Sequence, residues 1–194
     1  MSEFFVAGID GGQSSTTAVV GDAAGRPIGR GTAGPADEVG ESPDSTRLSD
    51  ALEGALANAR ANAGLPASAR FAAVVAGVSG YEGRLYGKRP ELATQRLQLM
   101  HDAPIAHAGA LAGKAGVVIV AGTGSVVYAS GREAERTSGG WGYLFGDEGS
   151  AFWVVRETLA AWMRAADDGA LGAGESDAAC AFFERSSLRA IAPG

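Results

Sequence analysis

Residues 5–20 read FVAGIDGGQSSTTAVV, and residues 117–128 read VVIVAGTGSVVY. Each stretch is a short apolar run, then a turn rich in glycine and hydroxyl side chains, then a second apolar run. Glycine lets the backbone turn tightly and present its N–H groups, while Ser and Thr add further donors. One such turn is weak evidence for a phosphate site. Two of them, far apart in the sequence, predict two half-sites that grip one polyphosphate from opposite sides.

The composition is that of an ordinary globular protein. The chain has 194 residues, 46% of them hydrophobic and 20% charged, which is enough for one large domain or two small ones. Its formal net charge of −6 argues against nucleic acid or an anionic membrane as the main partner. The single cysteine, Cys180, argues against an internal disulfide framework and a cysteine-cluster zinc site.

The hydrophobic runs of the chain are short. The first one feeds directly into the first glycine turn, so it predicts a strand and not a signal peptide. No apolar run approaches the ~20 residues of a membrane span. We therefore expect a cytoplasmic protein without a membrane partner.

The pattern after the first turn predicts an α/β unit. Leu48, Leu52 and Leu56 recur at helical spacing, and Asp44 or Ser45 can cap the helix that carries them. The continuous apolar run 71–78 indicates a strand buried on both faces, as in a mostly parallel sheet. The other expected elements are strands at 16–20 and 27–32, a helix around Glu91, and a strand that runs to Asp102.

The second half of the sequence repeats this plan. The elements expected there are strands at 117–121, 126–129 and 133–137, and a helix from about Ser150 with a buried stripe of Ala151, Val155, Leu159 and Trp162. A unit that occurs twice, with its glycine turn at the same joint, predicts two related α/β lobes that face a cleft. We expect one lobe at residues 1–103 and the other at residues 104–194.

Two carboxylates are candidates for chemistry. Asp10 closes the first strand immediately before Gly11 and Gly12, where it is either a turn-forming residue or a ligand that holds Mg²⁺ mainly through water. With the second glycine turn included, we favour the magnesium role. Asp102 lies where a strand meets a helix, and Pro104 fits a helix cap there. The alternative is a general base aimed into the cleft, and position alone leaves both interpretations open.

The least ordinary segment is 139–150, GGWGYLFGDEGS, which has five glycines in twelve residues. Such a stretch packs poorly as a strand or a helix. We interpret it as a ligand loop, with an aromatic ring for stacking and an Asp for hydroxyl groups. The turn at 122–125 could instead be an ordinary hairpin turn, but it is not a dinucleotide fingerprint, because a strand and not a helix follows it.

Together these motifs resemble the actin-like ATPase and sugar kinase superfamily. Within it, the Asp10-Gly11-Gly12 start, the turn at 122–125 and the segment 139–150 are similar to the BadF/BadG/BcrA/BcrD-type ATPases, and most of all to their N-acetylglucosamine and glucosamine kinases. The resemblance covers nearly the whole chain. It implies an α/β, ribonuclease H-like fold of duplicated actin-like lobes, with mixed sheets flanked by helices and an incomplete second lobe.

The resemblance also implies a reaction and a set of residue roles. The reaction is in-line transfer of the γ-phosphate of ATP, with Mg²⁺, to a hydroxyl of an amino sugar. Asp10 would organise Mg²⁺ through water, and Asp102 would take the proton from the sugar hydroxyl. Nucleotide contacts would come from Asp10, Gly11, Gly12, Ser14, Thr123 and Gly124. Sugar contacts would come from Asp37, Asp102, Ser125, Gly140, Trp141, Gly142 and Asp147.

Three features depart from the family pattern. Asp37 and His101 stand where relatives often have Asn, and relatives run on beyond Gly194 with the segment that binds adenine. The charge of Asp37 could favour the free amine of glucosamine over N-acetylglucosamine, or Asp37 could be a solvated loop acid. We expect a truncated or shortened chain that binds ATP weakly, has little activity alone, and exposes apolar surface that invites self-association, a homodimer included.

Two other classes of function share part of this sequence pattern. A non-catalytic lobe pair that binds sugar or nucleotide without turnover fits the missing adenine segment. An ATPase activator of a CoA-ester reductase would hold an iron–sulfur cluster through cysteines, and the single Cys180 argues against it.

Overall fold

The structure is a computed structural model that describes residues 4–191. The chain divides into two compact units, which are described separately below. The first unit comprises the residues up to Val118 together with Tyr128–Thr137, and the second comprises Ile119–Val127 together with the residues from Ser138 on. A lobe boundary between residues 103 and 104 stays a prediction.

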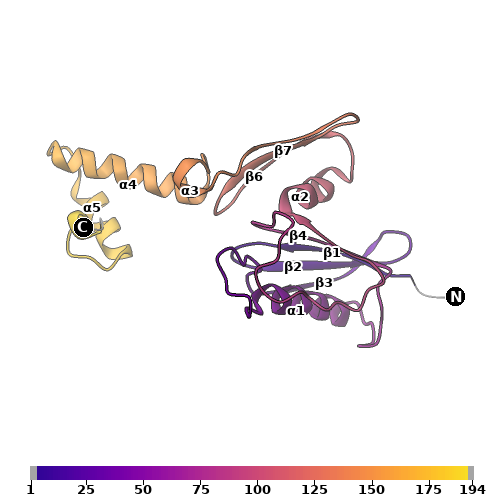
Figure 1. The fold of residues 1–194 in the computed structure, drawn as a ribbon. Helices are drawn as coiled ribbons and strands as arrows, with labels where there is room; N and C mark the ends of the chain where they lie inside the picture. Colours follow the sequence, from indigo (N-terminus) through magenta and orange to yellow (C-terminus); the bar gives the residue numbers. More distant parts are fainter. Residues whose placement is uncertain (1–3, 192–194) are drawn as a thin grey trace. The chain divides into compact units, whose positions relative to one another are not determined.

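The first unit is built on a five-stranded mixed sheet (Figure 1). Its strands, in the order β3-β2-β1-β4-β5, are β3 (Pro27–Ala33), β2 (Thr16–Gly21), β1 (Val6–Gly11), β4 (Ala73–Val78) and β5 (Leu97–His101). Strands β1, β2 and β3 pair antiparallel, whereas β4 pairs parallel with both β1 and β5. The predicted α/β fold with mixed sheets is therefore confirmed, and the carboxyl ends of β1, β4 and β5 lie at one edge of the sheet.

Helix α1 (Arg47–Asn62) packs on this sheet, as the leucine spacing predicts. The apolar core lies between them, and its largest fully buried side chains are Phe71, Ile9, Leu48, Leu52, Val20, Val74 and Val78. Each such side chain contributes about 1.5–3 kcal/mol to the free energy of unfolding. The N-cap position belongs to Thr46, one residue after Ser45 and two after Asp44, and the Thr46 side chain makes no capping hydrogen bond. The Ser45 hydroxyl nevertheless accepts the N–H of Arg47, the first residue of the helix, at 3.3 Å.

Glycines on β3 allow α1 to lie unusually close to the sheet. A Cβ atom on Gly31 would overlap with the backbone N of Ala59, and one on Gly29 with the backbone O of the same residue. Asn58 Nδ2 donates to the Thr32 carbonyl at 2.9 Å. The close approach thus joins the helix and strand by hydrogen bonding as well as by packing.

The predicted helix around Glu91 is wrong. Residues 79–96 form turns and a short bridge between Phe71 and Thr94. This segment has no helical repeat of apolar residues, and Pro90 removes a backbone donor. Its backbone bonds go elsewhere, since the N–H of Glu91 donates to the Glu53 carboxylate at 2.9 Å.

The rest of the chain carries a second sheet and several helices. The remaining elements are α2 (Asp102–Leu111), β6 (Gly116–Ala121), β7 (Ser125–Ser130), β8 (Glu135–Gly139), α3 (Gly142–Phe145), α4 (Ala151–Asp167), α5 (Ala173–Phe182) and a 3₁₀ turn at Leu188–Ala190. The second sheet has the order β6-β7-β8, and the division between the two units falls within its strands. Within residues 4–191, no helix is long and apolar enough to cross a bilayer.

Helix α4 begins where the sequence predicts. Ser150 is its N-cap, and the Ser150 hydroxyl accepts the N–H of Trp153 at 3.1 Å. The predicted buried stripe is wrong, because none of the residues of α4 is buried in this chain. Ala151 and Val155 are exposed, and Leu159 and Trp162 are half-buried. The apolar face of the helix has formed, but the described residues do not cover it.

Candidate functional site

The first glycine turn leaves hydrogen-bond donors open to solvent. The N–H of Gly12 donates to the Ser15 carbonyl at 3.0 Å, which closes the turn, and the N–H of Ala36 donates to the Gly12 carbonyl at 3.0 Å. Gln13 and Ser14 are exposed, and their N–H groups have no acceptor within residues 4–191. The turn is therefore shaped by neighbouring backbone and can offer two N–H groups to an anion.

Two acidic residues lie at the same end of the first sheet. Because β1, β4 and β5 run parallel, Asp10 at the end of β1 and Asp102 just after β5 both emerge at the carboxyl edge. Partial burial, and then the negative charge of Asp102, raise the pKa of the Asp10 carboxyl. The carboxylate of Asp102 is thus close enough to disfavour the charged form of Asp10, beside the first glycine turn.

Asp102 is paired with its neighbour His101. The Nδ1 atom of His101 lies 2.8 Å from Asp102 Oδ1, and this hydrogen bond is the main cause that raises the pKa of His101. The same Nδ1 lies 3.3 Å from the N–H of Ala103 and caps α2. Apart from the imidazole, the buried Oδ1 of Asp102 has no partner in the described structure. The capping interpretation of Asp102 is therefore replaced, since His101 holds the N-cap position.

The loop that carries Asp37 is anchored by a residue that the sequence analysis missed. Asp37 Oδ1 accepts the N–H of Val39 at 2.9 Å, which makes a local turn. The buried Glu38 carboxylate accepts the N–H groups of Tyr86 at 2.6 Å and Gly87 at 3.0 Å. No sequence signal indicates this anchor, because the partners are backbone groups that are distant in sequence.

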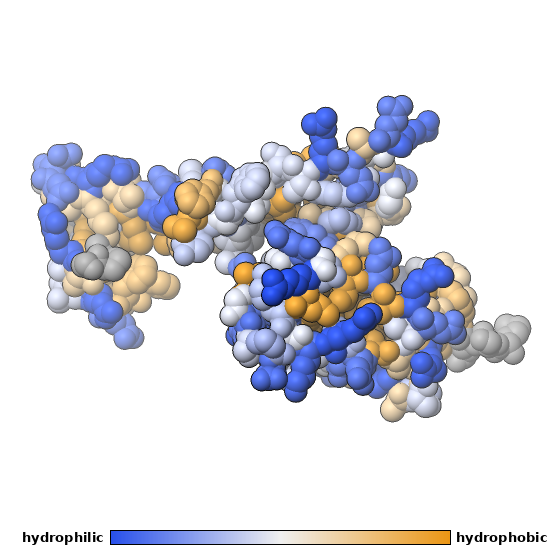
Figure 2. Space-filling view, in the orientation of Figure 1, coloured by the Kyte–Doolittle hydropathy of each residue, from blue (hydrophilic) through white to orange (hydrophobic). Residues whose placement is uncertain are grey.

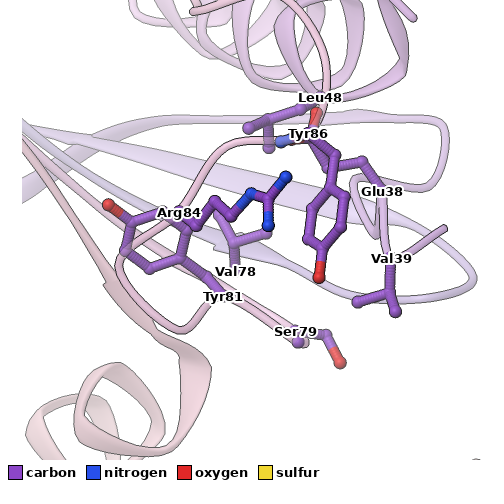
Figure 3. Close-up of a pocket in the computed structure, with 9 residues that line it drawn as sticks. Glu38, Val39, Leu48, Val78, Ser79, Tyr81, Arg84 and Tyr86 are labelled. Carbon is purple, nitrogen blue, oxygen red and sulfur yellow. The ribbon is translucent and has the colours of Figure 1, made fainter. Parts of the chain in front are cut away.

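A small cavity lies beside this anchor (Figure 3). Figure 3 shows Tyr86 and Arg84 side by side around it, and the Arg84 guanidinium stands 5.2 Å from the centre of the Tyr86 ring. The cavity volume is about 10 Å³, which suits one water-sized group.

In the second unit, the turn at 122–125 has the same design as the first. The N–H of Gly122 donates to the Gly124 carbonyl at 2.9 Å, which closes the turn. Thr123 is exposed and Gly124 is half-buried, and their N–H groups find no acceptor in the part of the chain that the structure describes. The N–H of Ser125 donates to Asp147 Oδ1 at 3.0 Å. Two donors are open here, and the third is taken by a carboxylate.

The glycine-rich segment 139–150 surrounds this turn. Gly139 and Gly140 have φ of 78° and 73°, a backbone region that L side chains rarely adopt. The Gly140 N–H donates to the Ser125 carbonyl at 3.0 Å, so the glycines bring the segment onto the turn. Trp141 is 77% exposed and is available for stacking on a ligand. Its predicted role stays a prediction.

The structure thus sorts the predicted site residues into two groups. In the first unit lie Asp10, Gly11, Gly12, Ser14, Asp37 and Asp102. In the second unit lie Thr123, Gly124, Ser125, Gly140, Trp141, Gly142 and Asp147. Asp10 and Asp102 are brought together with the first turn, and Asp147 is brought onto the second. Whether both turns contact one polyphosphate stays a prediction.

The fold is that of the actin-like ATPases and sugar kinases. A solved ROK family glucokinase from Streptomyces griseus shares it at a TM-score of 0.54 and 18% identity, over 89% of this chain and 66% of that one. More specifically, this chain belongs to the BadF/BadG/BcrA/BcrD ATPase family, whose sequence pattern matches residues 7–192.

Two proteins that are similar to this chain in sequence are named as kinases. A solved structure from Chromobacterium violaceum, provisionally named an N-acetylglucosamine kinase, is 28% identical with a TM-score of 0.78, over 94% of this chain. The N-acetylmuramic acid/N-acetylglucosamine kinase of Clostridium acetobutylicum is 34% identical over 73 residues, which are 37% of this chain. The present chain spans 65% of the first relative, and its match covers 24% of the second.

Proposed function

We propose that this chain carries phosphate and sugar sites of an ATP-dependent kinase that phosphorylates a hydroxyl of an amino sugar. The family and the names of the two relatives support the class of reaction. The observation that carries the proposal is the carboxylate pair, Asp10 and Asp102, beside a glycine turn with open N–H donors. Phosphoryl transfer needs one carboxylate near the metal and one near the attacking hydroxyl.

The residues present fit Mg²⁺ held mainly by water and phosphate. Mg²⁺ usually keeps several waters and takes one or two carboxylates together with substrate phosphates. Residues 4–191 contain no cluster of three or more His, Cys, Asp or Glu side chains that could hold a metal by themselves. Asp10 would be the carboxylate, since a cation offsets the burial and repulsion that raise its pKa. When bound, Mg²⁺ neutralises charge on the phosphates.

The chain's own groups would accept the proton and orient the phosphate. In this mechanism Asp102 accepts the proton of the sugar hydroxyl as that oxygen attacks the γ-phosphate. Each glycine turn by itself offers open N–H groups that would orient phosphate oxygens, those of Gln13 and Ser14 in the first unit and those of Thr123 and Gly124 in the second. Because such transfer depends on positioning more than on covalent chemistry by the protein, backbone donors on rigid turns suit the task.

Asp102→Asn tests the base. In a full-length version of the protein, we expect kcat with MgATP and sugar to fall by about 10² or more, with a modest change in sugar affinity, because Asn cannot accept the proton. The measurement is ADP release in steady-state kinetics. Asp22→Asn is the control, since Asp22 pairs with Arg26 in an exposed turn. An unchanged kcat in Asp102→Asn contradicts the proposed base.

For the substrate we favour an N-acetylated amino sugar over glucosamine. The named relatives point to acetylated sugars, and Asp37 Oδ1 is already committed to the Val39 N–H. We expect kcat/KM to be higher for N-acetylglucosamine, and the ratio of the two sugars to stay unchanged in Asp37→Asn. A preference for glucosamine that Asp37→Asn abolishes shows instead that Asp37 recognises a cationic amine.

A further inference from the structure

The side chain of Asp147 lies directly over the second glycine turn. Its Oδ1 accepts the N–H of Ser125 at 3.0 Å, and a Cβ atom added to Gly124 would meet its two oxygens at 3.0 and 3.1 Å. Asp147 is only 9% exposed and has a φ of 60°, which is uncommon outside glycine. An uncommon backbone conformation therefore directs a buried carboxylate at the turn.

A carboxylate at this place needs an explanation. A negative charge beside a turn that receives phosphate weakens anion binding by Coulomb repulsion. It also takes the Ser125 N–H, which an anion could otherwise use. The carboxylate also fixes the position of Gly124 and Ser125, next to the open N–H groups of Thr123 and Gly124.

Three other hydrogen bonds join the turn to the segment that carries Asp147. The Ser125 hydroxyl donates to the Glu148 carbonyl at 2.8 Å, the Gly140 N–H to the Ser125 carbonyl at 3.0 Å, and the Ala151 N–H to the Gly122 carbonyl at 2.9 Å. From that segment these bonds use only backbone groups, which nearly any residue supplies. Among the described contacts, Asp147 gives the segment's one side-chain bond to the turn, so residue identity matters there.

We propose that Asp147 is a positioning residue for the second phosphate turn. Its carboxylate holds Gly124 and Ser125 so that the N–H groups of Thr123 and Gly124 meet phosphate oxygens. This role differs from the sugar contact that the family resemblance implies. It rests on the proposed kinase function for the identity of the anion, whereas the hold on the turn can be tested without any ligand.

The first test is amide hydrogen exchange at Ser125 in this 194-residue chain. Asp147→Ala is expected to speed exchange at Ser125 by about tenfold or more, since a net hydrogen bond of about 1.5 kcal/mol is lost. Asp147→Asn keeps an acceptor oxygen and should retain most of the protection. Glu148→Ala is the matched control, because it removes the neighbouring exposed carboxylate and leaves the Ser125 bonds in place.

A second variant tests the contact over Gly124. Gly124→Ala places a methyl group against both oxygens of Asp147, so Ser125 exchange should rise as the carboxylate is displaced. In the Asp147→Ala background the three atoms nearest to that methyl are gone, and its added effect should nearly vanish. Effects of the two substitutions that simply add would overturn the proposed contact.

The third test is the affinity for MgATP, measured by calorimetry. We expect Asp147→Ala to weaken binding about tenfold, and Asp147→Asn to bind as well as wild type or better, because the charge is gone while the acceptor stays. Unchanged Ser125 exchange in Asp147→Ala, or a loss confined to sugar affinity, overturns the positioning role. If the wild-type chain binds no MgATP, the kinase proposal is contradicted. The hydrogen-exchange rates of Ser125 then still test whether Asp147 fixes the turn.

Discussion

At the scale of single residues, the Nδ1 atom of His101 has two partners that exclude each other. A protonated Nδ1 donates to Asp102 Oδ1, whereas an unprotonated Nδ1 accepts the N–H of Ala103. The proposed base therefore has a neighbour whose protonation changes what the base can do. In the first state Asp102 Oδ1 is hydrogen-bonded to the imidazole, and in the second this buried oxygen loses that partner.

Asp102→Asn should lower the pKa of His101 toward its ordinary value of 6.5, because the hydrogen bond to the carboxylate is the main cause that raises it. An NMR pH titration of the His101 ring measures this directly. His107 is the internal control, since its Nε2 contacts the Gly116 carbonyl and not Asp102. A His101 pKa that stays raised in Asp102→Asn would show that the pair does not govern its protonation.

The same pair predicts how stability depends on pH. The folded-state pKa of His101 is raised, so the contribution of the pair to the free energy of unfolding is fully present below about pH 6.5 and is lost as pH rises through the raised value. The difference in unfolding free energy between wild type and Asp102→Asn should accordingly shrink from pH 6 toward pH 8. Urea unfolding at several pH values measures it, and a difference that grows with pH contradicts the pairing.

Some of the site could be predicted from the sequence, and the reason is the regular geometry of strands. Asp10 and Asp102 each follow an apolar strand pattern, and parallel strands end at one edge, so their meeting was foreseeable. Glu38 and the orientation of Asp147 were not foreseeable. Glu38 bonds to the backbone of a distant loop, and Asp147 is turned by a positive φ that its residue type does not signal.

At the scale of elements, the contact between α1 and β3 depends on the absence of side chains. Gly29 and Gly31 face the backbone of α1 so closely that no Cβ atom fits. Asn58 and Asn62 then reach across the seam and donate to the carbonyls of Thr32 and Arg30. The contact between α1 and β3, called the seam here, is therefore held by close backbone packing and by hydrogen bonds from side-chain amides.

Gly31→Ala should destabilise the first unit by about 1–3 kcal/mol, because the new methyl overlaps with the helix backbone, which cannot move aside as a flexible side chain would. Gly8→Ala in β1 is the matched control, since its Cβ would meet nothing within 4 Å. We expect that control to stay within about 0.5 kcal/mol of wild type. Chemical denaturation measures the free energy of unfolding of both variants. Equal losses of stability would show that α1 and β3 are less tightly packed than described.

Helices and strands could be predicted where the apolar periodicity is strong. The predictions were wrong where contacts between distant segments determine the local structure. The apolar repeat of Leu48, Leu52 and Leu56 predicted α1, and continuous apolar runs predicted the central strands. The segment around Glu91 has no such repeat, and its backbone bonds to a distant side chain. For α4 the amphipathic pattern predicted a helix, but a pattern does not say whether anything covers the apolar face.

At the scale of the whole molecule, the second unit carries much of the exposed apolar surface. Figure 2 shows apolar atoms on the visible face of the part that carries α3, α4 and α5 in Figure 1. The large exposed side chains there are Trp141, Tyr143, Leu144, Phe145, Phe152, Val154, Val155, Phe182 and Phe183. Contiguous apolar surface on a folded chain marks sites of association.

We therefore expect this chain to self-associate as its concentration rises. The double variant Phe145→Ser/Phe182→Ser removes two rings that are 85% and 80% exposed, and it should shift the equilibrium toward monomer. Val39→Ser, on an exposed loop of the first unit, is the control and should leave association unchanged. Sedimentation equilibrium measures all three proteins. A wild type that stays monomeric at every concentration would show that this surface does not mediate self-association.

The hydrogen bond from the Ala151 N–H to the Gly122 carbonyl ties the start of α4 to the second turn, so a change in the angle of the turn would tilt the helix. Ala151 is the first residue of a 17-residue helix, which at 1.5 Å per residue is about 25 Å long. A tilt of about 5° at the turn then carries the far end of α4 through about 2 Å. If a ligand tilts the turn by this angle, a spectroscopic label near Asp167 would report the displacement.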